Sequence, residues 1–408
     1  MIEPLAKSPV QQEAPPVSVY RRLLLPIYAP TLLSAVSLQA LLLLIPLYVL
    51  DIGGSATLAA ILIGLRGVGM LLFDLPVGIL LSRFGDKPVL LIALLGMTLS
   101  ALLFALSQSE WVMVIAALFS GMGFTAWMIG RQYYISETSK IGERGRAIAA
   151  MSGTMRLGDF IGPALGAVIA HAFGFRVAFI LLALLMGSAA FMVFVFAHKI
   201  QSSRETGLTH VAQMSAIVRT HSRILITGGL ASIGLQLMRS GRVLLIPLFG
   251  HFLGLDITAI GLIISMAAVL DAALFYPSGF IMDRYGRKWS GVPCLILFAL
   301  SLALLPTTQG YYSLLAVSLL SGFANGLGAG LVLTLGSDLA PAYARGEFLG
   351  IWRLIGDFGH AGGPLLIGVL IELATLATAA TAIAGLGLLG AAVLYWLVDE
   401  TLKPEHRF

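Results

Sequence analysis

The stretches LPVGILLSRFGDKP, at residues 75–88, and YPSGFIMDRYGRKW, at residues 276–289, carry the same pattern 201 residues apart. The shared positions are Pro76, Gly78, Arg83, Gly85 and Lys87 in the first stretch and Pro277, Gly279, Arg284, Gly286 and Lys288 in the second. The same shift superposes three proline pairs, where chance would give about 0.3. The chain therefore contains two related halves, each of about 200 residues.

The composition excludes a soluble globular protein. Of the 408 residues, 58% are hydrophobic and 11% are charged, and the mean hydropathy is +0.95, whereas soluble domains have roughly 25% charged residues. Apolar runs of about 20 residues must form helices in a membrane, because lipid offers no partner for backbone amides. The runs predict transmembrane helices at 23–50, 57–81, 89–108, 111–135, 147–173, 176–198, 223–250, 257–281, 289–306, 311–340, 347–372 and 376–398.

These segments predict an all-α membrane protein with twelve transmembrane helices in two pseudo-symmetric six-helix bundles. We expect a tail at 1–22, a bundle at 23–198, a polar linker at 199–222, a second bundle at 223–398 and a second tail at 399–408. Two related halves that face each other across a site at mid-membrane depth are the architecture of a carrier.

The positive charges predict the orientation. Of 25 Lys and Arg residues, 18 fall on one side of the expected membrane, six lie in expected helices, and Arg176 alone falls on the other side. By the positive-inside rule, both tails and the linker are cytoplasmic. The charge therefore needs no nucleic-acid partner. We expect a monomer in a bacterial cytoplasmic (inner) membrane, with the lipid bilayer, protons and a small-molecule substrate as its partners.

Other chemistry is not indicated. Cys294 is the only cysteine, which excludes a disulfide framework and a cysteine-based metal site. The seven His are scattered, and no Ser nucleophile elbow is present, so we expect no metal, no cofactor and no enzymatic activity. The chain also lacks the Gly-x-x-x-x-Gly-Lys-[Ser/Thr] loop that binds nucleotide phosphates, so an ion gradient should supply the energy.

The repeated loop resembles that of the major facilitator superfamily, which reads Gly-x-x-x-Asp-Arg-x-Gly-Arg-Lys after the second helix. The second copy fits every position, including Gly279, Asp283, Arg284, Gly286, Arg287 and Lys288. The first copy keeps Gly78, Arg83, Gly85 and Lys87, but Ser82 replaces the Asp and Asp86 replaces the second Arg. The resemblance implies a cytoplasmic charge latch that is altered in the first half. The alternative is that these loops only enforce topology.

A second resemblance lies in the fifth helix. Gly158, Gly162, Pro163 and Gly166 are similar to the Gly-x-x-x-Gly-Pro-x-x-Gly-Gly pattern of the drug:proton antiporters of this family, with Ala167 in place of the last Gly. The resemblance implies export by antiport. The alternative is close helix packing along a stripe of glycines next to a proline kink.

Ionisable residues within the membrane are site candidates because burial in lipid is costly. They are Arg66, Asp74, Arg131, Arg156, Asp159, Arg239, Arg242, Asp271, Arg353, Asp357 and His360. In the family fold, helices 2 and 11 face each other across the two halves, as do helices 5 and 8. This implies the pairs Asp74–Arg353 and Arg156–Asp271, as structural ion pairs or as a gate that switches partners.

A carboxylate that loses its cation in a dry site is favoured in its protonated form. Asp271 and Asp74 are therefore our first candidates for proton coupling. Asp159, Asp357 and His360 come next.

The seventh helix predicts substrate contacts. Gln236, Arg239 and Arg242 recur at three-residue spacing on one stripe, while their counterparts in the first helix are apolar. We expect a cavity with a cationic wall in the second half and an apolar wall in the first, which suits an amphipathic or anionic compound. The remaining candidates for substrate contact are Gln39, Trp127, Phe124, Arg66 and Asn325. The alternative is that Arg239 and Arg242 pair or snorkel within their own bundle.

The sequence thus predicts a secondary active transporter that exports drug-like or amphipathic molecules in exchange for protons by alternating access. An importer or exchanger of an organic anion, using the Arg cluster, is the first alternative. A membrane-embedded enzyme or scaffold is the second.

Overall fold

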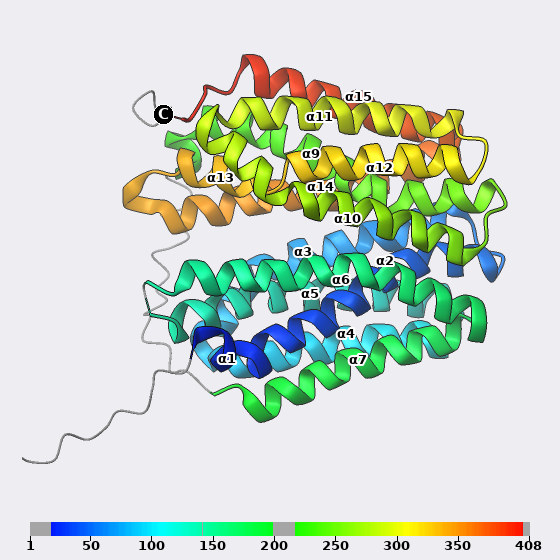
Figure 1. The fold of residues 1–408 in the computed structure, drawn as a ribbon, viewed down its shortest axis with the longest axis horizontal. Helices are drawn as coiled ribbons and strands as arrows, with labels where there is room; N and C mark the ends of the chain where they lie inside the picture. Colours follow the sequence, from blue (N-terminus) through cyan, green and yellow to red (C-terminus); the bar gives the residue numbers. More distant parts are fainter. Residues whose placement is uncertain (1–17, 141, 199–216, 403–408) are drawn as a thin grey trace, which may run out of the picture.

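The computed structural model describes residues 18–140, 142–198 and 217–402. The expected tails, up to residue 17 and from residue 403, and most of the expected linker lie outside these residues. Among them the chain is helical, and Figure 1 shows two helical bundles, one built from each half of the sequence. The expected all-helical fold is confirmed.

In its described residues the first half forms six helical spans. Its first span consists of α1, a π-helical turn η1 and α2. The helices of this half are α1 (Val19–Leu23), η1 (Leu24–Tyr28), α2 (Ala29–Asp51), α3 (Ala56–Phe84), α4 (Asp86–Leu106), α5 (Glu110–Thr138), α6 (Arg144–Phe173) and α7 (Phe175–Phe196).

The second half repeats this plan, with short 3-10 turns at η2 and η3. Its elements are α9 (Ser222–Phe252), α10 (Ile257–Arg284), α11 (Arg287–Leu304), η2 (Leu305–Thr307), α12 (Tyr311–Leu327), α13 (Leu331–Leu339), η3 (Ala342–Ala344), α14 (Arg345–Leu373) and α15 (Leu376–Trp396). In the described part of the chain, ten helical spans are long and apolar enough to cross a membrane. The other two long helices, α6 and α9, have similar lengths but are less hydrophobic on average.

The tenth span differs from the continuous helix expected at 311–340. It breaks between α12 and α13, where Gly330 has a φ of +79° that other residues rarely adopt. A break inside a membrane leaves backbone carbonyls without helical partners, and side chains must bond them. Ser290 donates to the carbonyl of Leu327, and Arg239 donates to that of Gly328 at 3.0 Å. Gly328 therefore ends α12, and Gly330 precedes the first residue of α13.

The glycine stripe of α6 packs against α2. A methyl group added at Gly162 would lie 2.5 Å from the carbonyl oxygen of Val36, and one added at Gly166 would lie 2.6 Å from the Ala40 Cβ. The second half repeats the contact, because a methyl group at Gly359 would lie 2.8 Å from Gln236 Cβ on α9. These glycines allow the backbones of the paired helices to approach closely.

The two halves meet along α3 with α14 and along α6 with α10. We call the side that carries the start of α1 and the end of α15 the terminal side (Figure 1). Away from this side, the Thr57 hydroxyl donates to the Glu372 carboxylate at 2.9 Å. A methyl group at Gly67 would lie 2.5 Å from the Ala361 Cα, and one at Gly261 would overlap Ala167. The halves are therefore in close contact on the side opposite the terminal side.

On the terminal side the same helices are apart. The antiparallel register of α3 against α14 places Gly78 opposite Gly350, yet an atom added at either glycine would meet no heavy atom within 4 Å. Gly279 on α10 is equally open. The halves thus diverge toward the terminal side.

Candidate functional site

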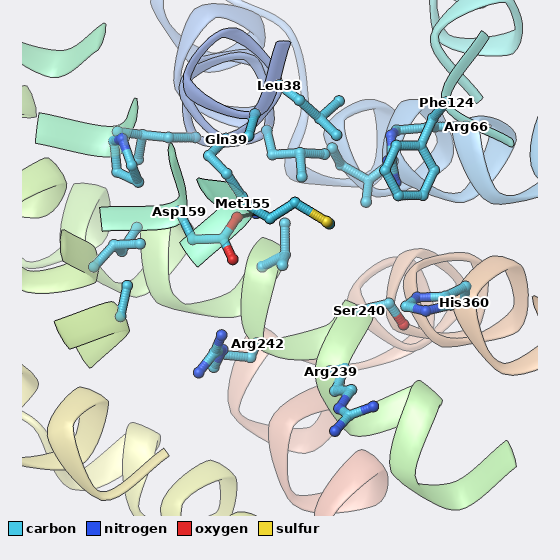
Figure 2. A pocket seen from close by; sticks show the side chains of 18 of the residues that line it. Leu38, Gln39, Arg66, Phe124, Met155, Asp159, Arg239, Ser240, Arg242 and His360 are labelled. Carbon is cyan, nitrogen blue, oxygen red and sulfur yellow. Dashed lines mark hydrogen bonds between the residues drawn. The ribbon is translucent and has the colours of Figure 1, made fainter. Parts of the chain in front are cut away.

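A cavity of about 300 Å³ lies between the two halves. Side chains from α2, α3, α4, α5 and α6 form its first wall, and side chains from α9, α10, α12 and α14 form its second wall (Figure 2). Its size is at the lower end of the range for small-molecule pockets. It contains all but one of the residues predicted to contact a substrate.

Charged side chains of both signs line the cavity. The arginines are Arg66, Arg131, Arg239 and Arg242, and the carboxylates are Asp159 and Asp271. Guanidinium groups therefore outnumber carboxylates among the lining residues.

Arg239 is held by neutral oxygens. Its guanidinium donates to Asn325 Oδ1 at 2.7 Å, to Gln236 Oε1 at 3.0 Å and to the carbonyl of Gly328 at 3.0 Å. Gln236 itself does not line the cavity and reaches it only through its bond to Arg239. Three hydrogen bonds fix the orientation of this guanidinium, whose planar fork suits several acceptors at once.

Arg239 belongs to a hydrogen-bonded chain that crosses between the halves. Asp271 accepts from Arg156 of α6 at 3.2 Å and from Asn325 at 2.5 Å. Asn325 accepts from Arg239 through its other atom, so this amide joins Asp271 to the arginine. A proton or charge change at Asp271 therefore alters the partners available to two arginines.

Asp159 and His360 occupy equivalent positions in the two halves, 201 residues apart. Asp159 accepts a hydrogen bond from Gln39 Nε2 at 2.6 Å, and His360 Nε2 lies 2.8 Å from Gln236 Nε2. Each half therefore presents one titratable group, held by a glutamine, to the centre of the molecule.

A second ion pair between the halves lies outside the cavity lining. Arg353 of α14 donates to Asp74 of α3 at 3.1 Å, and its Nε lies 3.6 Å from Asp357 one turn away. The Asp74 side chain is only 4% exposed. The structure thus brings together both residue pairs inferred across the halves, and it places Asp74 and Asp357 at a seam between helices rather than in the cavity.

Three cavity arginines contact rings or sulfur instead of carboxylates. Arg66 lies 4.9 Å from the Phe124 ring centre, Arg131 lies 5.8 Å from that of Trp127, and Arg242 lies 5.7 Å from that of Phe298. Arg66 and Arg131 each also approach a methionine sulfur, which is a weak acceptor. These contacts leave the three guanidinium groups able to bind a stronger acceptor, such as an anionic group of a ligand.

The sequence predicts Arg131 as an intramembrane charge but not as a substrate contact, and it does not single out Met155. Both line the cavity. Arg131 comes four residues after Trp127, a predicted contact, and this spacing puts both on one helix face. That spacing was the signal that could have identified Arg131.

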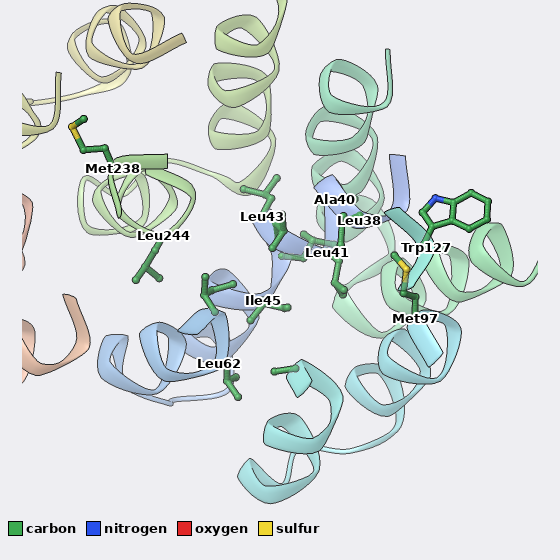
Figure 3. Close-up of a cluster of buried hydrophobic side chains, with 14 of the residues drawn as sticks. Leu38, Ala40, Leu41, Leu43, Ile45, Leu62, Met97, Trp127, Met238 and Leu244 are labelled. Atoms are coloured by element: carbon green, nitrogen blue, oxygen red, sulfur yellow. The ribbon is translucent and has the colours of Figure 1, made fainter. Parts of the chain in front are cut away.

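The first wall of the cavity contains a patch of apolar side chains. Leu38, Phe124 and Trp127 line it, and a buried cluster that includes Leu41 and Ile45 lies behind it (Figure 3). The expected division into an apolar and a cationic wall is wrong, however, because the first wall also carries Arg66, Arg131 and Asp159, while the second wall carries Arg239 and Arg242.

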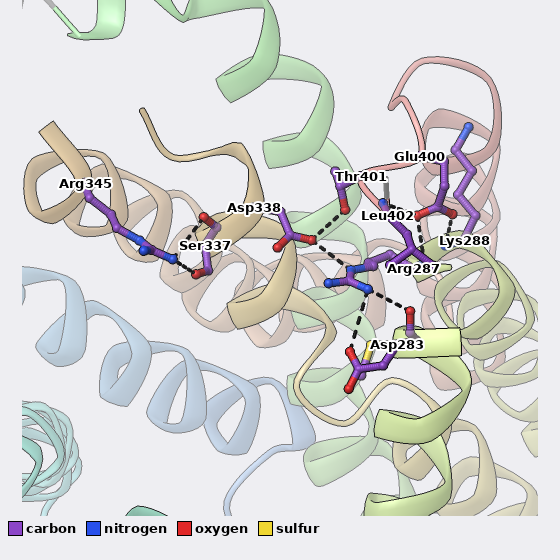
Figure 4. Close-up of polar contacts among 10 residues, drawn as sticks. Asp283, Arg287, Lys288, Ser337, Asp338, Arg345, Glu400, Thr401 and Leu402 are labelled. Atoms are coloured by element: carbon purple, nitrogen blue, oxygen red, sulfur yellow. Dashed lines mark hydrogen bonds and ion pairs between the residues drawn. The ribbon is translucent and has the colours of Figure 1, made fainter. Parts of the chain in front are cut away.

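The repeated loops differ between the halves. After α10, Arg287 contacts Asp338 at 2.8 Å and Asp283 at 3.7 Å, and Glu400 accepts from the first backbone N–H groups of α11 (Figure 4). After α3, the Ser82 hydroxyl instead bonds its own helix at the carbonyl of Ile79.

The loop glycines share one backbone requirement, since Gly85 and Gly286 have φ of +83° and +117°. The basic residues Arg83, Lys87 and Arg284 each lie over an aromatic ring. Lys288 donates to the carbonyl of Tyr395.

Comparison with known proteins agrees with this architecture. A family model described as Major Facilitator Superfamily matches residues 31–249 and 228–408. The chain is 24% identical over 326 residues to "Multidrug resistance protein MdtH" of Klebsiella pneumoniae (strain 342), covering 78% of this chain and 79% of that protein. It is 24% identical over 301 residues to "Multidrug resistance protein 2" of Bacillus subtilis (strain 168), covering 72% and 74%.

Solved structures share the fold at low sequence identity. A POT family transporter in complex with 5-aminolevulinic acid superposes with a TM-score of 0.74 at 10% identity, covering 92% of this chain and 95% of that one. A peptide transporter POT in complex with sulfate gives a TM-score of 0.75 at 13% identity, covering 93% and 95%.

Proposed function

Because the chain belongs to the Major Facilitator Superfamily and is a multi-pass membrane transporter rather than an enzyme, we propose that it exports drug-like or amphipathic organic molecules in exchange for protons. The observation that carries the proposal is the central cavity, which combines apolar side chains with titratable groups at the interface of two related halves. Relatives named as multidrug resistance proteins support export.

The geometry supports alternating access. The halves touch on the side opposite the terminal side and diverge toward the terminal side. With the terminal side facing the cytoplasm, as the positive charges indicate, this is an inward-facing state that takes up substrate from the cell interior. Rocking of the halves would close the terminal side and open the other.

The ion pairs between the halves are suited to respond to this motion. Arg156 and Asp271 belong to different halves and are 3.2 Å apart. When the helices move, Asp271 loses its cation, and a carboxylate in a poorly hydrated site then binds a proton more readily. Asp74 and Arg353 form an equivalent pair on the α3–α14 seam, and Asp159, Asp357 and His360 are further carriers.

We also propose the oligomeric state, the membrane and the division of the chain into moving parts. The chain acts as a monomer in a bacterial cytoplasmic membrane, with both termini in the cytoplasm. Residues 23–198 and 223–398 are the moving bodies, and residues 199–222 link them. The multidrug resistance relatives are bacterial, which supports this location.

The test is a flux assay in proteoliposomes with an imposed pH gradient and a panel of anionic, neutral and cationic amphiphiles. Substrate movement opposite to proton movement is expected. Proton and substrate flux in the same direction, or exchange of two organic solutes without proton flux, would replace the proposal with its rival.

That rival is an importer or exchanger of an organic anion on the same fold. The excess of guanidinium over carboxylate groups in the cavity favours it as the second candidate. The two differ in the direction of proton flux.

A further inference from the structure

Arg242 is the guanidinium in the cavity whose donors are least satisfied. In the described part of the chain, no carboxylate oxygen lies within 4.0 Å of the Arg242 guanidinium, the limit for an ion pair. Its Nη1 is buried and has no hydrogen-bond partner there. Its ring contact with Phe298 takes up one face of the group and leaves the N–H donors free. A buried donor without an acceptor is costly, so the site gains when a ligand supplies one.

Arg239, in the same cavity, differs from Arg242 because its N–H donors have hydrogen-bond acceptors. It lies three residues before Arg242 on α9, and its donors are bonded to Asn325, Gln236 and the Gly328 carbonyl. A ligand that bound Arg239 would have to displace these bonds. A ligand that binds Arg242 displaces none.

The surrounding charge favours the same kind of ligand. Asp271 lines the cavity but is already paired with Arg156 at 3.2 Å, so it offers little attraction to a cation. Asp159 is the other lining carboxylate, and Figure 2 shows it on the element facing Arg242. An organic cation would meet four guanidinium groups in this space, whereas an anion would neutralise part of an existing excess.

We propose that the transported molecule is an organic anion, an apolar ring system whose carboxylate, sulfonate or phosphonate group binds Arg242. This inference rests on the proposed function and narrows it to one substrate class. The oxyanion accepts two N–H donors from the guanidinium, which is the geometry that arginine provides. The ring system lies against Leu38, Phe124 and Trp127 on the opposite wall.

The Asp159 carboxylate competes with this anion for Arg242. It faces Arg242 and is bonded to Gln39. As a carboxylate it repels an incoming anion, so Asp159→Asn removes a repulsive charge and strengthens anion binding. The proposal therefore predicts changes of opposite sign at two residues on facing walls.

The experiment uses three probes that share one ring system: naphthalene-2-sulfonate, the isosteric neutral naphthalene-2-sulfonamide, and naphthalen-2-ylmethylammonium. Binding to the purified full chain in detergent is measured by isothermal titration calorimetry, with protein-free detergent as the blank. The sulfonate should bind about 10-fold or more tightly than the sulfonamide, since hydrogen bonds to charged groups are the stronger ones. The ammonium should bind most weakly.

Variants assign the preference to one residue. Arg242→Gln should weaken sulfonate binding about 10- to 100-fold and leave sulfonamide binding within about 2-fold. Arg242→Lys keeps the charge without the planar fork and should fall between them. Arg223→Gln, at an exposed position of the same helix, is the matched control and should bind like the wild type.

Two results would overturn the assignment: equal binding of sulfonate and sulfonamide by the wild-type protein, or sulfonate binding that Arg242→Gln does not change. The wild-type comparison needs no variant, so it decides even if a substituted chain fails to fold. Proton-driven export of the neutral or cationic probe alone would sink this inference and leave the proposed function intact. Anion-selective binding without any transport would support this inference and contradict the proposed function.

Discussion

Replacing Asp271 by Asn changes one charge and almost no volume, but it disturbs two hydrogen bonds at once. Asp271 accepts from Arg156 Nη1 at 3.2 Å and from Asn325 Nδ2 at 2.5 Å. An asparagine keeps only one acceptor, so its new NH2 group must face either a guanidinium or another amide donor. Asn325 can rotate to accept, but its oxygen then leaves Arg239 Nε, which it bonds at 2.7 Å.

The energetic cost can be bounded. Removing one partner of a buried ion pair costs about 3–5 kcal/mol, while exposed pairs contribute about 0–1 kcal/mol. The Arg156 and Asp271 side chains are 23% and 14% exposed, so water recovers part of the loss. We therefore expect Asp271→Asn to destabilise the inward-facing state by about 1–3 kcal/mol. Adding Arg156→Gln removes the orphaned cation, so the double variant should be more stable than Asp271→Asn alone.

Two assays check this. The apparent melting temperature of the purified variants should fall for Asp271→Asn and recover in the double variant. In proteoliposomes with a pH gradient, Asp271→Asn should abolish proton-driven transport while the protein is still inserted. Asp399→Asn, at an exposed position, is the control for the loss of a carboxylate. If Asp271→Asn moves substrate against a gradient at the wild-type rate, the proton-carrier role is wrong. If the single and double variants melt like the wild type, the Arg156–Asp271 ion pair does not stabilise the inward-facing state.

Contacts of the backbone support three further predictions. Gly78 and Gly350 lie opposite each other in the register of α3 and α14. Cysteines at both positions should form a disulfide only when bound substrate or a pH gradient closes the terminal side. If the resting protein crosslinks as fast as the protein with substrate or a pH gradient, the halves are not open on the terminal side. Gly162→Val should destabilise the protein by about 1–3 kcal/mol because its first added carbon already lies 2.5 Å from a backbone oxygen, whereas Gly153→Ala, with open space around it in the same helix, should not lower the melting temperature. The Glu400 carboxylate accepts hydrogen bonds from the first two backbone N–H groups of α11 at 2.9 and 3.0 Å. Glu400→Gln should therefore destabilise the start of this helix by about 0.5–2 kcal/mol. Unchanged amide hydrogen exchange at the start of α11 would contradict this prediction.

Much of the architecture could be read from local patterns. The 201-residue repeat and the apolar runs predict two related helical bundles, since hydrocarbon permits a spanning segment of this kind only as a helix. The depth of a charged residue within its run, together with the family's helix order, was enough to infer which helices carry partner charges, as for Asp74 with Arg353. Depth along a helix is a property of sequence position, so it needs no coordinates.

The differences between similar residues required the fold. Arg239 and Arg242 are indistinguishable in the sequence, three residues apart on one stripe. One is bonded to Asn325, 86 residues away, and to a carbonyl freed by a helix break, while Nη1 of the other has no acceptor among the described residues. Which of two neighbouring guanidinium groups is satisfied depends on the rotation of α9 and on what α12 presents to it. Helical periodicity sets the direction of a side chain on its own helix, but its partners come from helices distant in sequence, and only packing brings those into reach.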